Sequence, residues 1–172
     1  MTAPAPGEYA PAFAGYAAKA QSVSDPIEAL TVQLEQVLAM FQPLSREQWQ
    51  QRYAPGKWSL QELLGHITDT ERIFAYRALR IARGDTTILP GFDQDPYVIA
   101  AQSDACDPAS LLSEFEHVRK STILMCRNFP EAAWKRTGNL ANGPMTARAM
   151  IFIIYGHVAH HLEIVRERYH VR

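Results

Sequence analysis

Apolar side chains recur at helical spacing in four long stretches of the chain, and this pattern predicts its main elements. The four predicted helices cover residues 26–42, 59–84, 108–128 and 146–169. Each stretch has one apolar stripe and an opposite polar face, as expected of helices that share a core. The pattern therefore predicts an all-α fold, a four-helix bundle.

Helix-start signals support these boundaries. Asp25 precedes Pro26, which places a capping carboxylate before a proline at the first helical position. Ser59 and Glu62 have the spacing of a capping box, in which each side chain bonds the other residue's backbone N–H. Both signals favour a defined start for the first two long helices.

The segment 84–107 joins the second and third predicted helices and is long for a compact domain. Within it, Asp95 precedes Pro96 and predicts a short helix that ends at Ala101. A connection of this length is often functional, and the simpler interpretation is a strap that crosses the bundle. Both interpretations stay open at this point.

The remaining segments predict no regular structure. No stretch alternates Val, Ile or Thr with polar residues, so the pattern predicts no β-strand. Residues 130–144, which contain Gly138, Gly143 and Pro144, are expected to form a loop. Residues 1–24 are rich in Ala, Pro, Gly and Ser and predict an irregular arm with one short helical turn, ahead of a bundle domain over 25–172.

Composition narrows the class of protein. The chain has 172 residues, enough for one domain with a core, and a formal net charge of −1, so no global field favours nucleic acid or a membrane surface. Cys106 and Cys126 are far apart and form no CxxC motif, which fits a reducing compartment. The N-terminus lacks a secretory signal, and the longest apolar stretch is too short to span a bilayer. We therefore expect a soluble, cytoplasmic protein.

Histidines interrupt the apolar stripe of the last predicted helix. His157 and His161 are four residues apart, so they lie one turn apart on one face, where two imidazoles can reach one metal ion. His66, on the second helix, would supply a third ligand. Three imidazoles leave positions for water or substrate, which is typical of catalytic sites, and Zn²⁺, Ni²⁺ and Fe²⁺ all tolerate this set.

Spacing alone favours a simpler interpretation, in which these are hydrogen-bonded core or surface histidines. His160 lies about 60° around the helix from His157 and is an alternative partner, although His161 lies only about 40° away. Asp69, three residues after His66, is a candidate for a hydrogen-bond partner of the site or a base that acts on metal-held water. Its simpler interpretation is an exposed helix carboxylate.

Other candidates have a simpler structural interpretation. Arg77 and Arg80 could meet an anionic substrate, but they equally suit the C-terminal end of a helix. Tyr155 is expected in the core, and Cys126 is expected to be a packed thiol. The sequence has no glycine-rich phosphate loop and no Ser-His-Asp motif.

Several motifs together resemble those of one superfamily. They are Trp58-Ser59 leading to His66, Asp69-Thr-Glu-Arg72, Phe74-Ala-Tyr-Arg-Ala-Leu-Arg80, Gly84-Asp85, Leu89-Pro-Gly-Phe-Asp93 and Gly156-His157-Val-Ala-His160-His161-Leu162. On these segments, from about the first long helix to Tyr169, the chain resembles the DinB/YfiT-like superfamily of metal-binding four-helix bundles.

The resemblance implies a divalent metal ion held by His66, His157 and His161, and pairing of the chain as a homodimer. Characterised relatives include S-transferases that use bacillithiol or similar thiols and a mycothiol-dependent isomerase, while others are described as metal-dependent hydrolases. We therefore expect a metal-dependent enzyme that acts on a small molecule, with a low-molecular-weight thiol or water as nucleophile. The alternatives are a metal-dependent hydrolase and a non-catalytic stress protein that binds a metal or small ligand.

Overall fold

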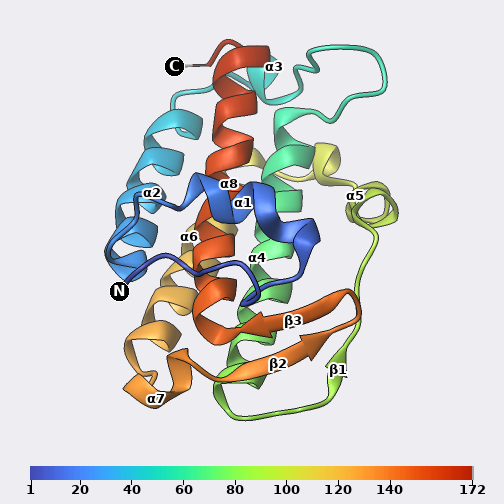
Figure 1. Cartoon of the computed structure of the whole chain (residues 1–172). Helices are drawn as coiled ribbons and strands as arrows, with labels where there is room; N and C mark the ends of the chain where they lie inside the picture. The colour runs from blue at the N-terminus through green and yellow to red at the C-terminus, as the bar shows by residue number, and fades with distance from the viewer. Residues whose placement is uncertain (172) are drawn as a thin grey trace.

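Four long helices form the frame of the computed structural model, which describes residues 1–171 (Figure 1). They are α2 (Pro26–Phe41), α4 (Leu60–Ala82), α6 (Pro108–Arg127) and α8 (Ala147–Arg168). Their bounds lie within two residues of the predicted ones. The all-α four-helix bundle is thus confirmed.

The order of the helices explains the long connection after α4. α2 and α4 each pack against both α6 and α8, and α4 and α6 run in the same direction (Figure 1). Two parallel neighbours need a connection that returns along the bundle. Residues 83–107 make this return, through β1 (Ile88–Leu89), α5 (Gln94–Ala101) and the 3₁₀ turn η2 (Ser103–Ala105).

The short helix in this connection begins slightly earlier than the sequence predicts. Asp93 is the cap of α5, since its side chain accepts a hydrogen bond from the Asp95 backbone N–H at 3.2 Å. Asp95 lies in the first turn instead. Two Asp residues two positions apart make the cap ambiguous from sequence, because either carboxylate suits a helix N-terminus.

The prediction of no strand is wrong for one small sheet. β2 (Thr137–Leu140) pairs with β3 (Gly143–Thr146) as a hairpin, and β1 adds to β2 in parallel. These strands contain Gly, Asn and Pro, which have low β-propensity, so the sequence pattern did not predict them. Tertiary contacts hold the sheet instead: a Cβ at Gly138 would lie 2.6 Å from the Ile81 side chain, so the hairpin lies directly on α4. The predicted loop 130–144 also contains the short helix α7 (Glu131–Trp134).

The N-terminal segment lies across α8 (Figure 1). It contains the 3₁₀ turn η1 (Pro11–Phe13) and the short helix α1 (Ala14–Lys19). A Cβ at Gly156 would lie 2.0 Å from the Tyr16 carbonyl oxygen, so glycine there allows α1 to approach the α8 backbone. Further along the segment, the Glu8 carbonyl accepts a hydrogen bond from the Thr146 N–H at 2.8 Å.

One buried polar network joins all four long helices. The Arg119 guanidinium on α6 is fully buried and donates to both carboxylate oxygens of Glu71 on α4, at 2.7–3.0 Å. It also donates to the Leu30 carbonyl and the Gln33 side chain on α2. Gln33 in turn donates to the Tyr155 carbonyl on α8 at 3.0 Å. The network therefore fixes the positions of the helices along one another.

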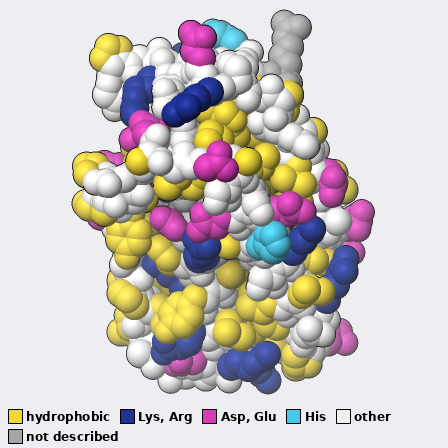
Figure 2. Space-filling model, turned by 180° about the vertical axis from the view of Figure 1, so that it is seen from behind, with side chains coloured by type: hydrophobic (Ala, Val, Ile, Leu, Met, Phe, Trp, Pro, Cys, Tyr) yellow, Lys and Arg dark blue, Asp and Glu magenta, His cyan; other side chains and the backbone are white. Residues whose placement is uncertain are grey.

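The face that Figure 2 shows has no large area of a single charge. Acidic and basic side chains are interspersed there among apolar ones, in keeping with the net charge of −1. Such mixing gives no extended basic area on this face for a nucleic acid. Among the helices of residues 1–171, none is both long and apolar enough to cross a membrane.

Replacing Arg119 by Met tests the buried network. The change leaves the Glu71 carboxylate buried without its partner, and we expect the free energy of unfolding to fall by about 3–5 kcal/mol. Urea unfolding measures this change. Lys120→Met, at an exposed neighbouring position, is the control and should change stability by less than about 0.5 kcal/mol. Equal effects of the two substitutions would contradict a role of the network in stability.

Candidate metal centre

The start of α4 places His66 near the centre of the bundle. The Ser59 side chain accepts from the Glu62 N–H at 3.0 Å, and the Glu62 carboxylate accepts from the Ser59 N–H at 2.9 Å. The predicted capping box is thus confirmed. Trp58, just before the cap, packs against the His66 ring with centroids 4.8 Å apart. The cap and the Trp58 ring together fix where the imidazole lies.

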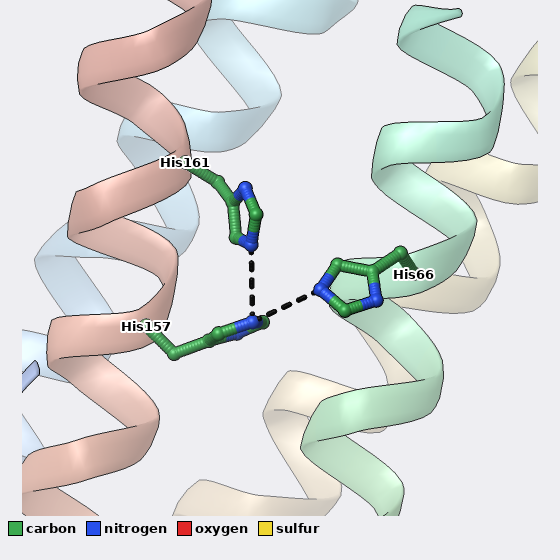
Figure 3. A group of neighbouring side chains, drawn as sticks. All are labelled: His66, His157 and His161. Carbon is green, nitrogen blue, oxygen red and sulfur yellow. Dashed lines mark hydrogen bonds between the residues drawn. The ribbon is translucent and has the colours of Figure 1, made fainter. Parts of the chain in front are cut away.

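The other two histidines come from α8, which faces α4. His157 and His161 lie one turn apart and point toward His66 (Figure 3). The Tyr16 ring of α1 packs edge-on against the His157 ring, with centroids 5.2 Å apart. The close approach of α1 at Gly156 therefore also orients a histidine of the site.

The Nε2 atoms of the three histidines converge. The Nε2 atom of His157 lies 3.1 Å from that of His66 and 3.1 Å from that of His161 (Figure 3). One ligand atom from each residue lies within 4.8 Å of the other two. In a tetrahedral site with metal–nitrogen bonds of ~2.0–2.1 Å, neighbouring nitrogens lie about 3.3 Å apart. The two separations of 3.1 Å are close to this value and suit a shared cation.

Burial keeps the three imidazoles neutral. It lowers the pKa of His66 to about 4 and that of His161 to about 3. The pKa of His157 is also well below its usual range, because of burial and then the neighbouring His161 and His66. At neutral pH the rings therefore have unprotonated nitrogens, the form that binds a metal ion.

Hydrogen bonds alone do not satisfy this cluster. Each neutral imidazole nitrogen offers either one proton or one lone pair. The Nε2 atom of His157, which has two nitrogen neighbours at 3.1 Å, can make one good hydrogen bond and not two. A cation that accepts a lone pair from each ring removes the conflict, so the donor set fits a divalent metal ion.

The structure also separates the two histidines that the sequence left as alternatives. His161 joins the cluster, whereas His160 is only half-buried and packs against Tyr16 and the His161 ring. The Nδ1 atom of His161 is buried and has no hydrogen-bond partner within residues 1–171. Packing between neighbouring rings therefore holds its orientation.

Two cavities reach the cluster. The first, of about 420 Å³, contacts His66 and His157, and we call it the Arg77 cavity. Its other walls include Arg77, Pro90 and Asn142. The second, of about 720 Å³, contacts His161, and we call it the Trp58 cavity. Residues of the long connection line both, so that connection is a strap and also part of the site.

Asp69 is not part of the group of converging ligand atoms. Its carboxylate pairs with Arg72 at 3.4 Å, and Arg72 also pairs with Glu114 of α6 at 2.7 Å. Burial raises the pKa of Asp69, against the lowering effect of Arg72. Asp69 is absent from the walls of both cavities. Its role at the site stays a prediction.

The sequence did not point to several residues around the site. Phe13 and Tyr16 of the N-terminal segment and Asn142 of the hairpin line the Arg77 cavity, and no local pattern connects them with α4. Thr70 lines it as well. The sequence does place Thr70 beside the site, because it follows His66 by four residues and so lies on the same face of the helix.

Comparison with known proteins identifies the family. A profile of the DinB superfamily matches residues 29–165. The chain belongs to the DinB superfamily. No curated protein matches it.

Solved structures support the DinB assignment at the level of the fold. YfiT from Bacillus subtilis, described as a probable metal-dependent hydrolase with an unusual four-helix bundle topology, has a TM-score of 0.66 and 17% identity over 82% of this chain and 84% of YfiT. The DinB-like protein YjoA from Bacillus subtilis has a TM-score of 0.61 and 16% identity over 84% of this chain and 90% of YjoA.

A third similar structure is longer than this DinB-superfamily chain. The mycothiol-dependent maleylpyruvate isomerase has a TM-score of 0.66 and 14% identity over 79% of this chain. The matched region covers 57% of the isomerase. At these identities the likeness concerns the bundle alone.

Substitution of single histidines tests the ligand set. His66→Ala, His157→Ala and His161→Ala each remove one convergent nitrogen, and we expect each to weaken zinc binding at least 100-fold. Competitive titration with a chromogenic chelator measures the affinity. His160→Ala is the matched control and should keep wild-type affinity. A His66→Ala variant with wild-type affinity and stoichiometry would show that the ligand set is wrong.

The lowered histidine pKa values predict how zinc affinity depends on pH. Protons compete with the metal only as the pH falls toward the pKa of the free imidazoles, about 4 for His66 and about 3 for His161. We therefore expect an almost constant affinity between pH 8 and about pH 5.5. Ordinary imidazoles, with a pKa of about 6.5, would already lose affinity below pH 6.5. A steep loss starting there would contradict neutral, buried ligands.

Proposed function

We propose that the protein is a metal-dependent enzyme that joins a low-molecular-weight thiol to a small electrophilic molecule. The observation that carries this proposal is the convergence of three neutral imidazoles at a place that two cavities reach. Three protein ligands with an open side are typical of catalytic metal sites. A purely structural site would be closed by a fourth protein ligand.

The two cavities favour a reaction of two molecules. The Arg77 cavity meets the cluster at His66 and His157, and the Trp58 cavity meets it at His161. One reactant can therefore approach from each side. Hydrolysis needs only one cavity of this size, since the second reactant is water. The geometry thus supports thiol transfer ahead of hydrolysis.

The chain would supply the metal ligands, orient them and exclude water from part of the site. His66, His157 and His161 would hold the ion, and this ligand set suits zinc, nickel and iron, because all three accept imidazole ligands. A divalent ion there lowers the pKa of a thiol or water, and so supplies a nucleophile near neutral pH. The rings of Tyr16 and Phe74 pack edge-on against His157 and would exclude water from that part of its ring.

Two further candidates are retained because of specific observations. The fold similarity to YfiT, described as a probable metal-dependent hydrolase, keeps hydrolysis as the second candidate. A buried three-histidine site also suits a protein that binds a metal or small ligand without catalysis. The pairing of two copies, which the superfamily resemblance implies, stays a prediction.

Turnover assays on the zinc-loaded protein test the proposal. Glutathione, cysteine, bacillithiol and mycothiol are each mixed with 1-chloro-2,4-dinitrobenzene, and formation of the thioether is followed by absorbance. We expect at least one thiol to react at least 100-fold faster than without protein, and the acceleration to disappear on chelation and in His66→Ala. His160→Ala should retain it.

Other outcomes distinguish the alternatives. Hydrolysis of p-nitrophenyl acetate without a thiol, and no thioether formation with any thiol, would favour the hydrolase. No turnover in either assay, together with stoichiometric metal binding, would favour the binding protein. Asp69→Asn tests the remaining prediction from the sequence, because loss of a base would lower turnover without changing zinc affinity.

A further inference from the structure

One stripe of α4 forms a wall of the Arg77 cavity. His66, Thr70, Phe74 and Arg77 all line it, at intervals of four, four and three residues. These intervals place the side chains on one face of the helix, in line from the histidine cluster to the far end of the cavity. The wall therefore presents an imidazole, a hydroxyl, an aromatic ring and a guanidinium in sequence.

The Arg77 guanidinium is buried without a counter-ion. The residue is 5% exposed, and its one hydrogen bond within residues 1–171 goes to the Pro90 carbonyl at 2.6 Å. No carboxylate of the described chain lies within 4.0 Å of it, although Asp93 lines the same cavity. A guanidinium has five N–H donors and prefers an anion. Most of its N–H groups thus have no acceptor in the described chain.

Aromatic rings hold the guanidinium in place. Its central carbon lies 5.6 Å from the centroid of the Phe74 ring and 5.8 Å from that of Phe92. Contacts of this kind are favourable for arginine and restrict the plane of the group. Together with the Pro90 carbonyl, they keep the cation at the cavity wall although burial disfavours it.

Thr70 supplies a second uncommitted group, between His66 and Arg77. The residue is 2% exposed, and its Oγ1 atom has no hydrogen-bond partner within residues 1–171. Other helical threonines of the chain behave differently: Thr68 and Thr122 donate to the carbonyl four residues earlier, at 2.8 and 3.1 Å. A buried hydroxyl without a hydrogen-bond partner destabilises the folded protein. A ligand that forms a hydrogen bond with Thr70 would remove this cost and so bind more tightly.

We propose that the Arg77 cavity binds a substrate with a carboxylate, which pairs with Arg77, while a polar atom nearer the reacting end bonds Thr70. This inference rests on the proposed function, because it names the ligand class of that site. Arg77 is the one Lys or Arg among the described residues that line this cavity. Its single charge, away from the histidines, favours a monoanion such as a carboxylate over a phosphate monoester, which would bring a second negative charge to that end. The Phe74 ring, which contacts both the Arg77 guanidinium and the His157 ring, spaces the carboxylate from the reacting end.

Binding of matched neutral and anionic probes tests the proposal without turnover. Hexanoate, hexanamide and butyl phosphate are titrated into the ¹⁵N-labelled protein with and without zinc, and amide chemical shifts give the dissociation constants. We expect hexanoate to bind at least tenfold more tightly than hexanamide and more tightly than butyl phosphate. The largest shifts should occur at residues that line the Arg77 cavity.

Arg77→Met should reduce the hexanoate preference to near one and leave hexanamide binding unchanged. Arg77→Lys keeps the charge but lacks the planar guanidinium, and we expect it to give an intermediate preference. It replaces Arg77→Met as the test variant if Arg77→Met does not fold. The control is Arg80→Met, because Arg80 pairs with Asp85 outside the cavity. No preference in the wild type, an unchanged preference in either Arg77 variant, or tighter binding of butyl phosphate would overturn the proposal.

Zinc titration of the same samples separates the two proposals. A protein that binds no zinc yet prefers hexanoate through Arg77 contradicts the proposed enzyme and supports the carboxylate site. A protein that binds zinc but shows no hexanoate preference contradicts the carboxylate site alone.

Discussion

The ion pair between Arg119 and Glu71 is the contact on which the arrangement of the bundle depends. Apolar stripes bring helices together, but they tolerate sliding, because many apolar contacts are nearly equivalent. A buried guanidinium bound to a carboxylate has one favourable position, and losing it leaves a buried charge. Through Leu30 and Gln33 the same group reaches α2, and through Gln33 it reaches the α8 backbone. The network therefore selects one alignment of four helices.

The histidine cluster depends on this alignment. His66 lies on α4 five residues before Glu71, and His157 lies on α8 two residues after Tyr155, whose carbonyl bonds Gln33. A shift of one turn between α4 and α8 would move the imidazoles apart by about 5.4 Å. The contacts that fix the bundle are thus also the contacts that bring three nitrogens together. The same helices then expose Thr70 and Arg77 to the cavity beside the cluster.

Local spacing predicted the long helices and the caps of the first two, and the family motifs predicted the convergence of His66 with His157 and His161. Features that depend on contacts distant in sequence were out of reach. The hairpin around Gly138 is held by Ile81, and its residues have low strand propensity. Arg119 and Glu71 look like ordinary surface charges until the fold buries them. Arg77 was recognised as a possible anion site, but only the structure shows that it has no counter-ion in the described chain and lines a cavity.

We propose that the three buried histidines together hold one divalent metal ion. Crystals of the zinc-loaded protein, measured on both sides of the zinc absorption edge, test it most directly. We expect one anomalous peak per chain, within bonding distance of the Nε2 atoms of His66, His157 and His161. A peak bound by other residues, or crystals grown with zinc that show no peak between these atoms, would contradict it.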